Sequence, residues 1–188
     1  AHLDPDRDPS VAVRAAYGWW LPYVLDLDAD WVRDRAARIV GRGETPLERA
    51  AWEGFLFRGG PSAVALGVFA QAYQGYAEQL AAQDAKLATS GRAGDPLHFY
   101  IDHLVRAWLW RSEMRDELPL RTLVASGKAW LAAEVTEEAG RLIGRTEREH
   151  ISPQLATAYR DLWTFVLQGT SNLEGDDLST ALAPFAWW

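Results

Sequence analysis

The stretch over residues 45–80, TPLERAAWEGFLFRGGPSAVALGVFAQAYQGYAEQL, decides the fold class of this chain, because it predicts two helices joined by a tight turn. Thr45 supplies an N-cap oxygen, Pro46 suits the first helical position, and Glu48 completes a capping box. The sequence GGPS at 59–62 ends one helix and begins the next. The second helix carries one apolar stripe at helical period: Leu66, Phe69, Tyr73, Tyr76 and Leu80.

Further helical patterns lie on both sides of this pair. Before it we predict helices over 10–25, interrupted near Pro22, and over 31–40. After it we predict helices over 95–108, 119–126, 128–144, 152–169 and 178–188. No stretch shows sustained alternation of apolar and polar residues or a hairpin dipeptide between β-branched runs. The sequence therefore predicts an all-α fold.

Helix starts of the form Thr/Asp/Ser-Pro recur at 45–46, 95–96 and 152–153. These intervals exceed the roughly 40–47 residues of ordinary HEAT and armadillo units. We predict stacked antiparallel helical hairpins, a degenerate HEAT- or armadillo-like array of about eight to nine helices. A single irregular helical bundle is the alternative. Residues 1–9 are predicted to form a flexible arm, and residues 10–188 one helical domain.

Composition excludes several classes of protein. The chain has 188 residues, of which 48% are hydrophobic and 24% charged, as in ordinary globular proteins. Its formal charge of −7 argues against binding to nucleic acid or to anionic membranes, both of which need a basic face. The absence of cysteine excludes disulfides and thiolate metal sites, and no apolar run approaches the roughly 20 residues that span a bilayer. We expect a cytoplasmic protein.

The two ends of the sequence suggest a larger parent. The chain opens without an initiator methionine and closes on the apolar sequence LAPFAWW. Domain termini are usually polar and exposed. We therefore expect this chain to be a fragment of a longer polypeptide.

Few residues suggest chemistry. His98 and Asp102 share one helical face, and we expect a hydrogen bond between them to orient the imidazole. Glu147-x-x-His150 is a single pair, whereas di-metal carboxylate bundles need two such pairs and two further glutamates. We predict no catalytic residue, no cofactor site and no metal site. Four charged residues are expected to form a solvated helical face: Glu134, Glu137, Glu138 and Arg141.

The ten tryptophans and their aromatic neighbours admit two interpretations. Adjacent or alternate tryptophans point to different sides of a helix, so some of them face away from the local core. The predicted contact surface, which in an intact array packs against a neighbouring unit, consists of Trp20, Trp110, Trp187 and Trp188. In the alternative, a compact bundle holds a small apolar ligand in a pocket lined by Tyr73, Tyr76, Tyr100 and Trp108.

The sequence AAWEGFLFRGGPS at 50–62 resembles the C-terminal helical regions of very large bacterial defence-type proteins. Further phrases follow in the family's order: HLVRAW at 103–108, LIGR at 142–145, LW at 162–163 and FAWW at 185–188. The resemblance covers residues 50–188, and its motifs are apolar packing sequences. It implies a sensor or scaffold segment behind an N-terminal sirtuin-like NAD-hydrolysing or nucleotide-hydrolysing domain. No catalytic residue of that family matches a position in this chain.

We therefore expect a non-catalytic helical segment that mediates protein–protein contact. Its expected partners are other domains of the parent chain or another protein, and its oligomeric state is left open. The rival hypothesis is the ligand-binding bundle. An enzyme ranks third, because the acid, base and nucleophile sets that catalysis requires are missing from the sequence.

Overall fold

The computed structural model describes residues 4, 8–84, 95–147 and 150–187, and within them every regular element is a helix. The all-α prediction is confirmed, whereas the arrangement of hairpins as a repeat array stays a prediction. The chain divides into two compact units, residues 1–76 and 77–188. The extent of the predicted helical domain stays a prediction, and most of the predicted arm over 1–9 lies outside the described residues.

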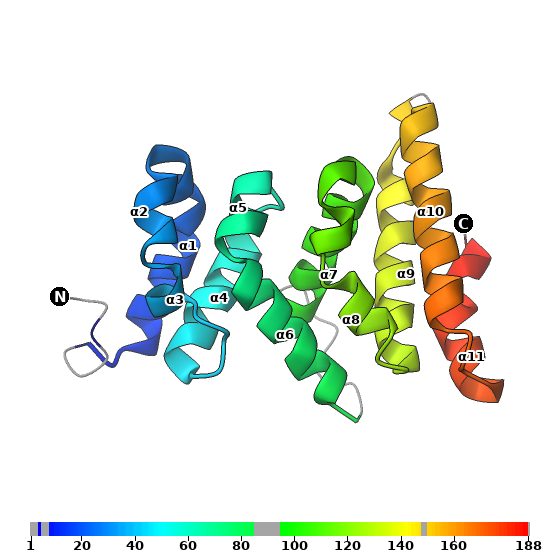
Figure 1. The fold of residues 1–188 in the computed structure, drawn as a ribbon, viewed down its shortest axis with the longest axis horizontal. Helices are drawn as coiled ribbons and strands as arrows, with labels where there is room; N and C mark the ends of the chain where they lie inside the picture. The colour runs from blue at the N-terminus through cyan, green and yellow to red at the C-terminus, as the bar shows by residue number, and fades with distance from the viewer. Residues whose placement is uncertain (1–3, 5–7, 85–94, 148–149, 188) are drawn as a thin grey trace. The chain divides into compact units, whose positions relative to one another are not determined.

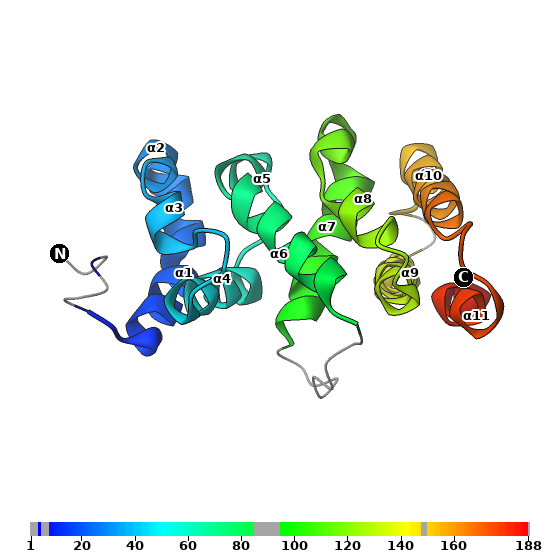
Figure 2. The same cartoon turned by 60° about the horizontal axis from the view of Figure 1, so that its bottom comes forward.

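The first unit is built on α1 (Val11–Leu27) and α4 (Pro46–Arg58), which lie side by side (Figure 1, Figure 2). Glycines allow this close approach. A Cβ atom added at Gly18 would lie 1.9 Å from the carbonyl oxygen of Ala51, and one at Gly54 would lie 2.5 Å from that of Ala15. Any side chain at these two positions must therefore push the helices apart.

Helix α1 continues through Pro22, so the predicted interruption there is wrong. An internal proline removes one backbone hydrogen bond and costs about 3 kcal/mol in a helix. Leu21 and Leu25 on either side of it are buried in the unit. Their burial offsets that cost, because each buried leucine contributes about 1.5–3 kcal/mol.

The remaining helices of the first unit are shorter than expected. The predicted helix over 31–40 is two helices, α2 (Ala29–Arg33) and α3 (Ala36–Ile39). The second helix of the decisive pair is also divided, into α5 (Ala63–Val68) and α6 (Ala70–Ala82), with the boundary between the two units inside α6. Phe69 separates these two helices, with φ −104° and ψ 19°, and its ring packs against Phe55 at 4.7 Å. Aromatic packing has therefore taken precedence over helix continuity.

The predicted caps and core of the first unit are present. Thr45 Oγ1 accepts a hydrogen bond from the Glu48 amide at 3.2 Å, and the Glu48 carboxylate accepts one from the Thr45 amide at 3.2 Å. The core is aromatic: the Trp52 ring meets the Tyr73 ring edge-on at 4.8 Å, and both side chains are buried. Burial raises the pKa of the Tyr73 hydroxyl far above its ordinary value.

The second unit contains α7 (Pro96–Trp110), α8 (Leu120–Val124), α9 (Ala129–Arg145), α10 (Pro153–Gly169) and α11 (Gly175–Leu182). In the described residues, the 3₁₀ helix η1 (Ser112–Glu117) lies between α7 and α8, and the 3₁₀ helix η3 (Ala183–Trp187) follows α11. Helix α9 contacts α7, α10 and α11. The Trp108 indole N–H donates to the Ala158 carbonyl at 3.2 Å and so ties α7 to α10. The Thr136 hydroxyl, 3.4 Å from the Ala181 carbonyl, ties α9 to α11.

Candidate functional site

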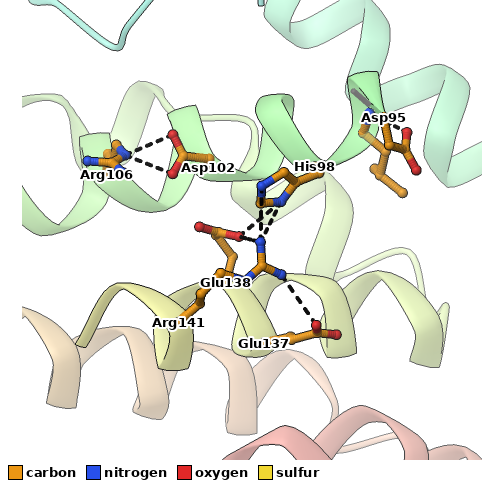
Figure 3. Close-up of polar contacts among 8 residues, drawn as sticks. Asp95, His98, Asp102, Arg106, Glu137, Glu138 and Arg141 are labelled. Carbon is orange, nitrogen blue, oxygen red and sulfur yellow. Dashed lines mark hydrogen bonds and ion pairs between the residues drawn. The ribbon is translucent and has the colours of Figure 1, made fainter. Parts of the chain in front are cut away.

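A charged cluster joins α7 to α9 in the second unit (Figure 3). We call it the α7/α9 cluster and define it as His98, Asp102 and Arg106 of α7 with Glu138 and Arg141 of α9. Asp102 accepts from Arg106 Nε at 2.7 and 2.8 Å, one helical turn along α7. The hydrogen-bond contacts of the His98 ring are with Arg141, whose Nη1 lies 2.8 Å from Nδ1 and 3.0 Å from Nε2, so the predicted hydrogen bond between Asp102 and His98 is wrong.

Glu138 is buried, with a side chain only 2% exposed, so the prediction that it belongs to a solvated face is wrong. Its neighbours fit that prediction better, because Glu137 is exposed and Arg141 is partly exposed. The sequence contained the signal: with Leu131, Val135 and Leu142, Glu138 completes an apolar stripe with steps of 4, 3 and 4 residues. A carboxylate on such a stripe faces the core and needs a partner.

Two side chains supply that partner. Glu138 Oε2 lies 2.7 Å from Arg141 Nη1 and 3.1 Å from His98 Nδ1, so the contact crosses from α9 to α7. Arg141 also reaches Glu137 Oε1 at 3.3 Å (Figure 3). The guanidinium therefore connects an exposed carboxylate to a buried one.

The surroundings shift the protonation of both groups. Burial raises the pKa of Glu138 to about 7, with a further contribution from the Asp102 carboxylate, while Arg141 acts in the opposite direction. Burial lowers the pKa of His98, and the positive charge of Arg141 lowers it further. Near neutral pH the His98 imidazole is therefore mostly uncharged, and the Glu138 carboxyl group is partly protonated.

A carboxyl group with this pKa has the proton affinity of a general acid or base, but a substrate has little access to the buried Glu138 side chain. Glu138 is enclosed, and His98 and Arg141 are the partly exposed groups in front of it, at 35% and 31%. The cleft described below does not include any of these three residues in its lining. The contacts of the cluster join α7 to α9.

An open cleft of about 600 Å³ lies between the end of α7, η1 and the start of α10. The Trp110 indole and the Arg115–Asp161 ion pair, 2.9 Å long, contribute to its lining. This lining does not contain the residues predicted for an apolar pocket: Tyr73, Tyr76, Tyr100 and Trp108. Tyr73, Tyr100 and Trp108 are buried, and Tyr76 lies 6.5 Å from the Trp52 ring. The apolar ligand pocket stays a prediction.

The predicted contact tryptophans fall into two groups. Trp20 is 58% exposed on the first unit, and Trp110 is 49% exposed on the second. The side chains of Trp187 and Trp188 lie outside the described residues. The role of these four residues in protein contact stays a prediction.

Trp20 belongs to a larger exposed face that the sequence prediction missed. We call it the α1 outer stripe and define it by the exposed residues Val13, Ala16, Trp20, Tyr23 and Leu27. Trp20 and Tyr23 pack ring against ring at 5.3 Å, and Leu27 is 85% exposed. The opposite face of α1 is buried through Gly18, Leu21 and Leu25, so the helix is apolar on two sides.

Side chains of α1 and α4 extend this face. Phe57 stacks on Trp19 at 5.2 Å, and both rings are partly exposed. The Arg58 guanidinium lies 5.5 Å from the ring centres of Trp19 and Tyr23 and donates a hydrogen bond to the Tyr23 hydroxyl. Arg58 makes no ion pair with any residue that the structure describes. Trp19, Phe57 and Arg58 thus add two rings and one cation to the α1 outer stripe.

Two other classes of site are absent from the described parts of the chain. In these parts no three His, Asp or Glu side chains gather as metal ligands would, and no helix has the length and apolarity that crossing a membrane requires. Comparison with protein-family models, with curated proteins and with solved structures finds no match to this chain.

Proposed function

We propose that this chain is a non-catalytic helical scaffold or sensor segment that contacts protein through its first unit, within a larger bacterial protein of the defence type. The observation that carries the proposal is the α1 outer stripe, an apolar face along the whole of α1 with Trp20 at its centre. Exposed apolar faces of this extent mark interaction sites. Trp20 and Tyr23 of this stripe, and Arg58 beside it, belong to the residue types most enriched at the energetic centres of protein interfaces.

Two observations from the second unit favour this proposal over its rivals. Glu138 has a pKa near neutrality, as a general acid or base needs, but its side chain is buried between the helices that it joins, which argues against acid–base catalysis. The cleft beside Trp110 is not lined by any of the four residues predicted for the apolar pocket of the alternative.

Site-specific photo-crosslinking in bacterial cells that contain the parent protein tests the proposal. A photoreactive phenylalanine analogue in place of Trp20 should give one discrete adduct with a protein segment, located by mass spectrometry either elsewhere in the parent chain or in another protein. The same analogue in place of Arg121, an exposed residue of α8, is the matched control and should give no such adduct. Equal labelling from both positions, or turnover of NAD or ATP by the purified chain, would contradict the proposal.

A further inference from the structure

The carboxyl groups of Asp102 on α7 and Glu138 on α9 meet at the interface of these two helices (Figure 3). We call these two groups the carboxyl pair. Burial raises the pKa of Glu138, and a hydrogen bond with the Asp102 side chain raises it further. Two ionised carboxylates cannot form a hydrogen bond with each other, because both only accept. Their contact therefore requires a proton on one of them.

The charges around the carboxyl pair also call for one proton. Two guanidinium groups and three carboxyl groups pair with one another here: Arg106, Arg141, Asp102, Glu137 and Glu138. Glu134 and Arg145, whose charges also act on His98, add one charge of each sign. One carboxylate is thus in excess, and a proton on this group of side chains would balance the charge.

The imidazole of His98 does not hold that proton. Arg141 Nη1 lies 2.8 Å from Nδ1 and 3.0 Å from Nε2 of the ring. A guanidinium group only donates hydrogen bonds, so a nitrogen of the His98 ring must accept, and an imidazolium has no accepting nitrogen. Burial and the charge of Arg141 lower the pKa of His98, in agreement with a neutral ring.

Within the carboxyl pair, Glu138 is the protonated member. Asp102 accepts from Arg106 Nε at 2.7 and 2.8 Å, which stabilises its charge. The Glu138 side chain is 2% exposed, and among the described residues neither of its oxygens receives an aligned hydrogen bond. A buried carboxylate without donors is costly, whereas a carboxylic acid is neutral and can donate its own O–H.

The other elements that pack on α9 do not change this assignment. Tyr159 of α10 is buried, and burial raises the pKa of its hydroxyl to about 12, so it stays neutral. The helix η3 has no charged residue. The charged residues of α8 and α11 are exposed: Arg121, Asp176 and Asp177. The groups that decide the protonation of Glu138 therefore lie on α7 and on α9 itself.

We infer that one proton, held by Glu138 and donated in a hydrogen bond to the Asp102 carboxylate, fixes α7 against α9, so that this helix contact is closed at acidic pH and opens as the pH rises. When the proton passes to water, Glu138 loses its O–H donor and becomes a second negative charge beside Asp102. Both carboxylates then need water, which separation of α7 from α9 admits. The inference does not depend on the proposed function, since it concerns the second unit alone.

The sign of the pH dependence follows from the closed state. Because the pKa of Glu138 is raised there from 4.5 to about 7, the closed contact is fully favoured below about pH 4.5 and is weakened as the pH rises through about 7. The opening equilibrium constant should rise up to about tenfold per pH unit between these values, as release of one proton requires.

Carbon-13 NMR of the chain labelled at its Asp and Glu carboxyl carbons tests where the proton lies. The Glu138 resonance should titrate with a midpoint near pH 7, and the Asp102 resonance should shift at the same midpoint as it loses its donor. Asp102→Asn replaces the acceptor by an amide that donates, so the acid dissociation constant of Glu138 should rise at least about tenfold. Asp161→Asn makes the same change on α10 and should leave it unaltered.

Amide hydrogen exchange, corrected for the intrinsic effect of pH, tests the opening. Protection of α7 and α9 should fall between about pH 5 and pH 7, while that of α1 and α4 in the first unit stays constant. In Glu138→Gln the amide still donates to Asp102, so the fall should disappear.

Three results would overturn the inference. The first is Glu138 ionised throughout this range, or an imidazolium at His98 in the nitrogen-15 spectrum. The second is a Glu138 midpoint that Asp102→Asn does not move, which would assign the raised pKa to burial alone. The third is protection of α7 and α9 that does not change with pH, or that changes equally in α1 and α4.

Discussion

Glu138 on α9 places its Oε2 atom 3.1 Å from Nδ1 of His98 on α7, so a carboxylate in the interior of the second unit meets a half-exposed imidazole across a helix interface. Arg141 lies 2.7 Å from the same carboxylate oxygen. These contacts offset only part of the cost of removing the carboxylate from water, since its pKa stays raised to about 7, and they link the packing of α7 on α9 to its protonation.

Replacing Glu138 by glutamine should change how stability depends on pH. Because burial raises the pKa of Glu138 in the folded chain from 4.5 to about 7, the folded state holds this proton more tightly than the unfolded state. The resulting stabilisation is complete below about pH 4.5 and is lost as the pH rises through about 7. Urea unfolding followed by circular dichroism should show wild-type stability falling between about pH 5 and pH 8, with a smaller fall in Glu138→Gln.

His98 acts in the opposite direction and provides the control for that experiment. Its lowered pKa means that stability is lost as the pH falls below the unfolded value of 6.5. His98→Gln should therefore flatten the acidic side of the profile and leave the alkaline fall in place. The same alkaline fall in Glu138→Gln as in the wild type would show that another group causes it.

Replacing Arg141 by glutamine should destabilise the second unit more at high pH than at low pH. The variant leaves an ionised carboxylate buried without its cation, and removing one partner of a buried ion pair typically costs about 3 kcal/mol or more. At low pH Glu138 is protonated and the cost is smaller. Unfolding of Arg141→Gln and of the matched surface variant Arg121→Gln at about pH 5 and pH 8 tests this, and an equal loss at both values would exclude the ion pair as its cause.

Replacing Gly18 by alanine should disrupt the packing of α1 on α4. The new Cβ would lie 1.9 Å from the Ala51 carbonyl oxygen, a backbone atom that cannot move alone. Overpacking of this kind typically costs about 1–3 kcal/mol, and a clash with backbone belongs at the upper end. Gly67→Ala on α5 is the matched control, because no atom lies within 4 Å of its Cβ, and it should be neutral or stabilising in a thermal unfolding experiment.

Removing the oxygen of Thr45 should weaken the start of α4. Thr45→Ala deletes the acceptor of the Glu48 amide and should cost about 1 kcal/mol. Thr45→Ser keeps that oxygen and should retain most of the stability. Denaturant titrations of both variants measure the difference, and equal stabilities would mean that the capping box contributes little to folding.

The N-cap residues and the helical spacing of apolar residues made many of the helices predictable from the sequence. Ser10, Asp28, Thr45, Asp95 and Ser152 each accept a hydrogen bond at the start of a helix, as their local sequences suggest. The breaks at Phe69 and between α2 and α3 could not be predicted in this way, because tertiary packing decides them. The same limit applies to Pro22, because the burial of Leu21 and Leu25, which offsets the cost of this proline, depends on tertiary packing.

The candidate sites were harder to predict than the fold. Position 138 has the spacing of a buried residue, but the charge of a glutamate predicts exposure, and the two signals conflict at this position. The α1 outer stripe could not be recognised from sequence, since Leu21 and Trp20 are both apolar and only the structure shows which of them is covered. The position of Arg58 over rings from a second helix depends on how α1 and α4 pack.

The close approach of α1 and α4 at Gly18 and Gly54 also bears on the speed of recognition. Trp19 and Phe57 come from different helices, yet they are stacked before any partner arrives. A surface that is ordered in advance loses little conformational entropy on association. We expect encounter with a partner to proceed at the roughly 10⁵–10⁷ M⁻¹s⁻¹ usual for rigid docking, so that the lifetime of the complex, and not its rate of formation, sets its affinity.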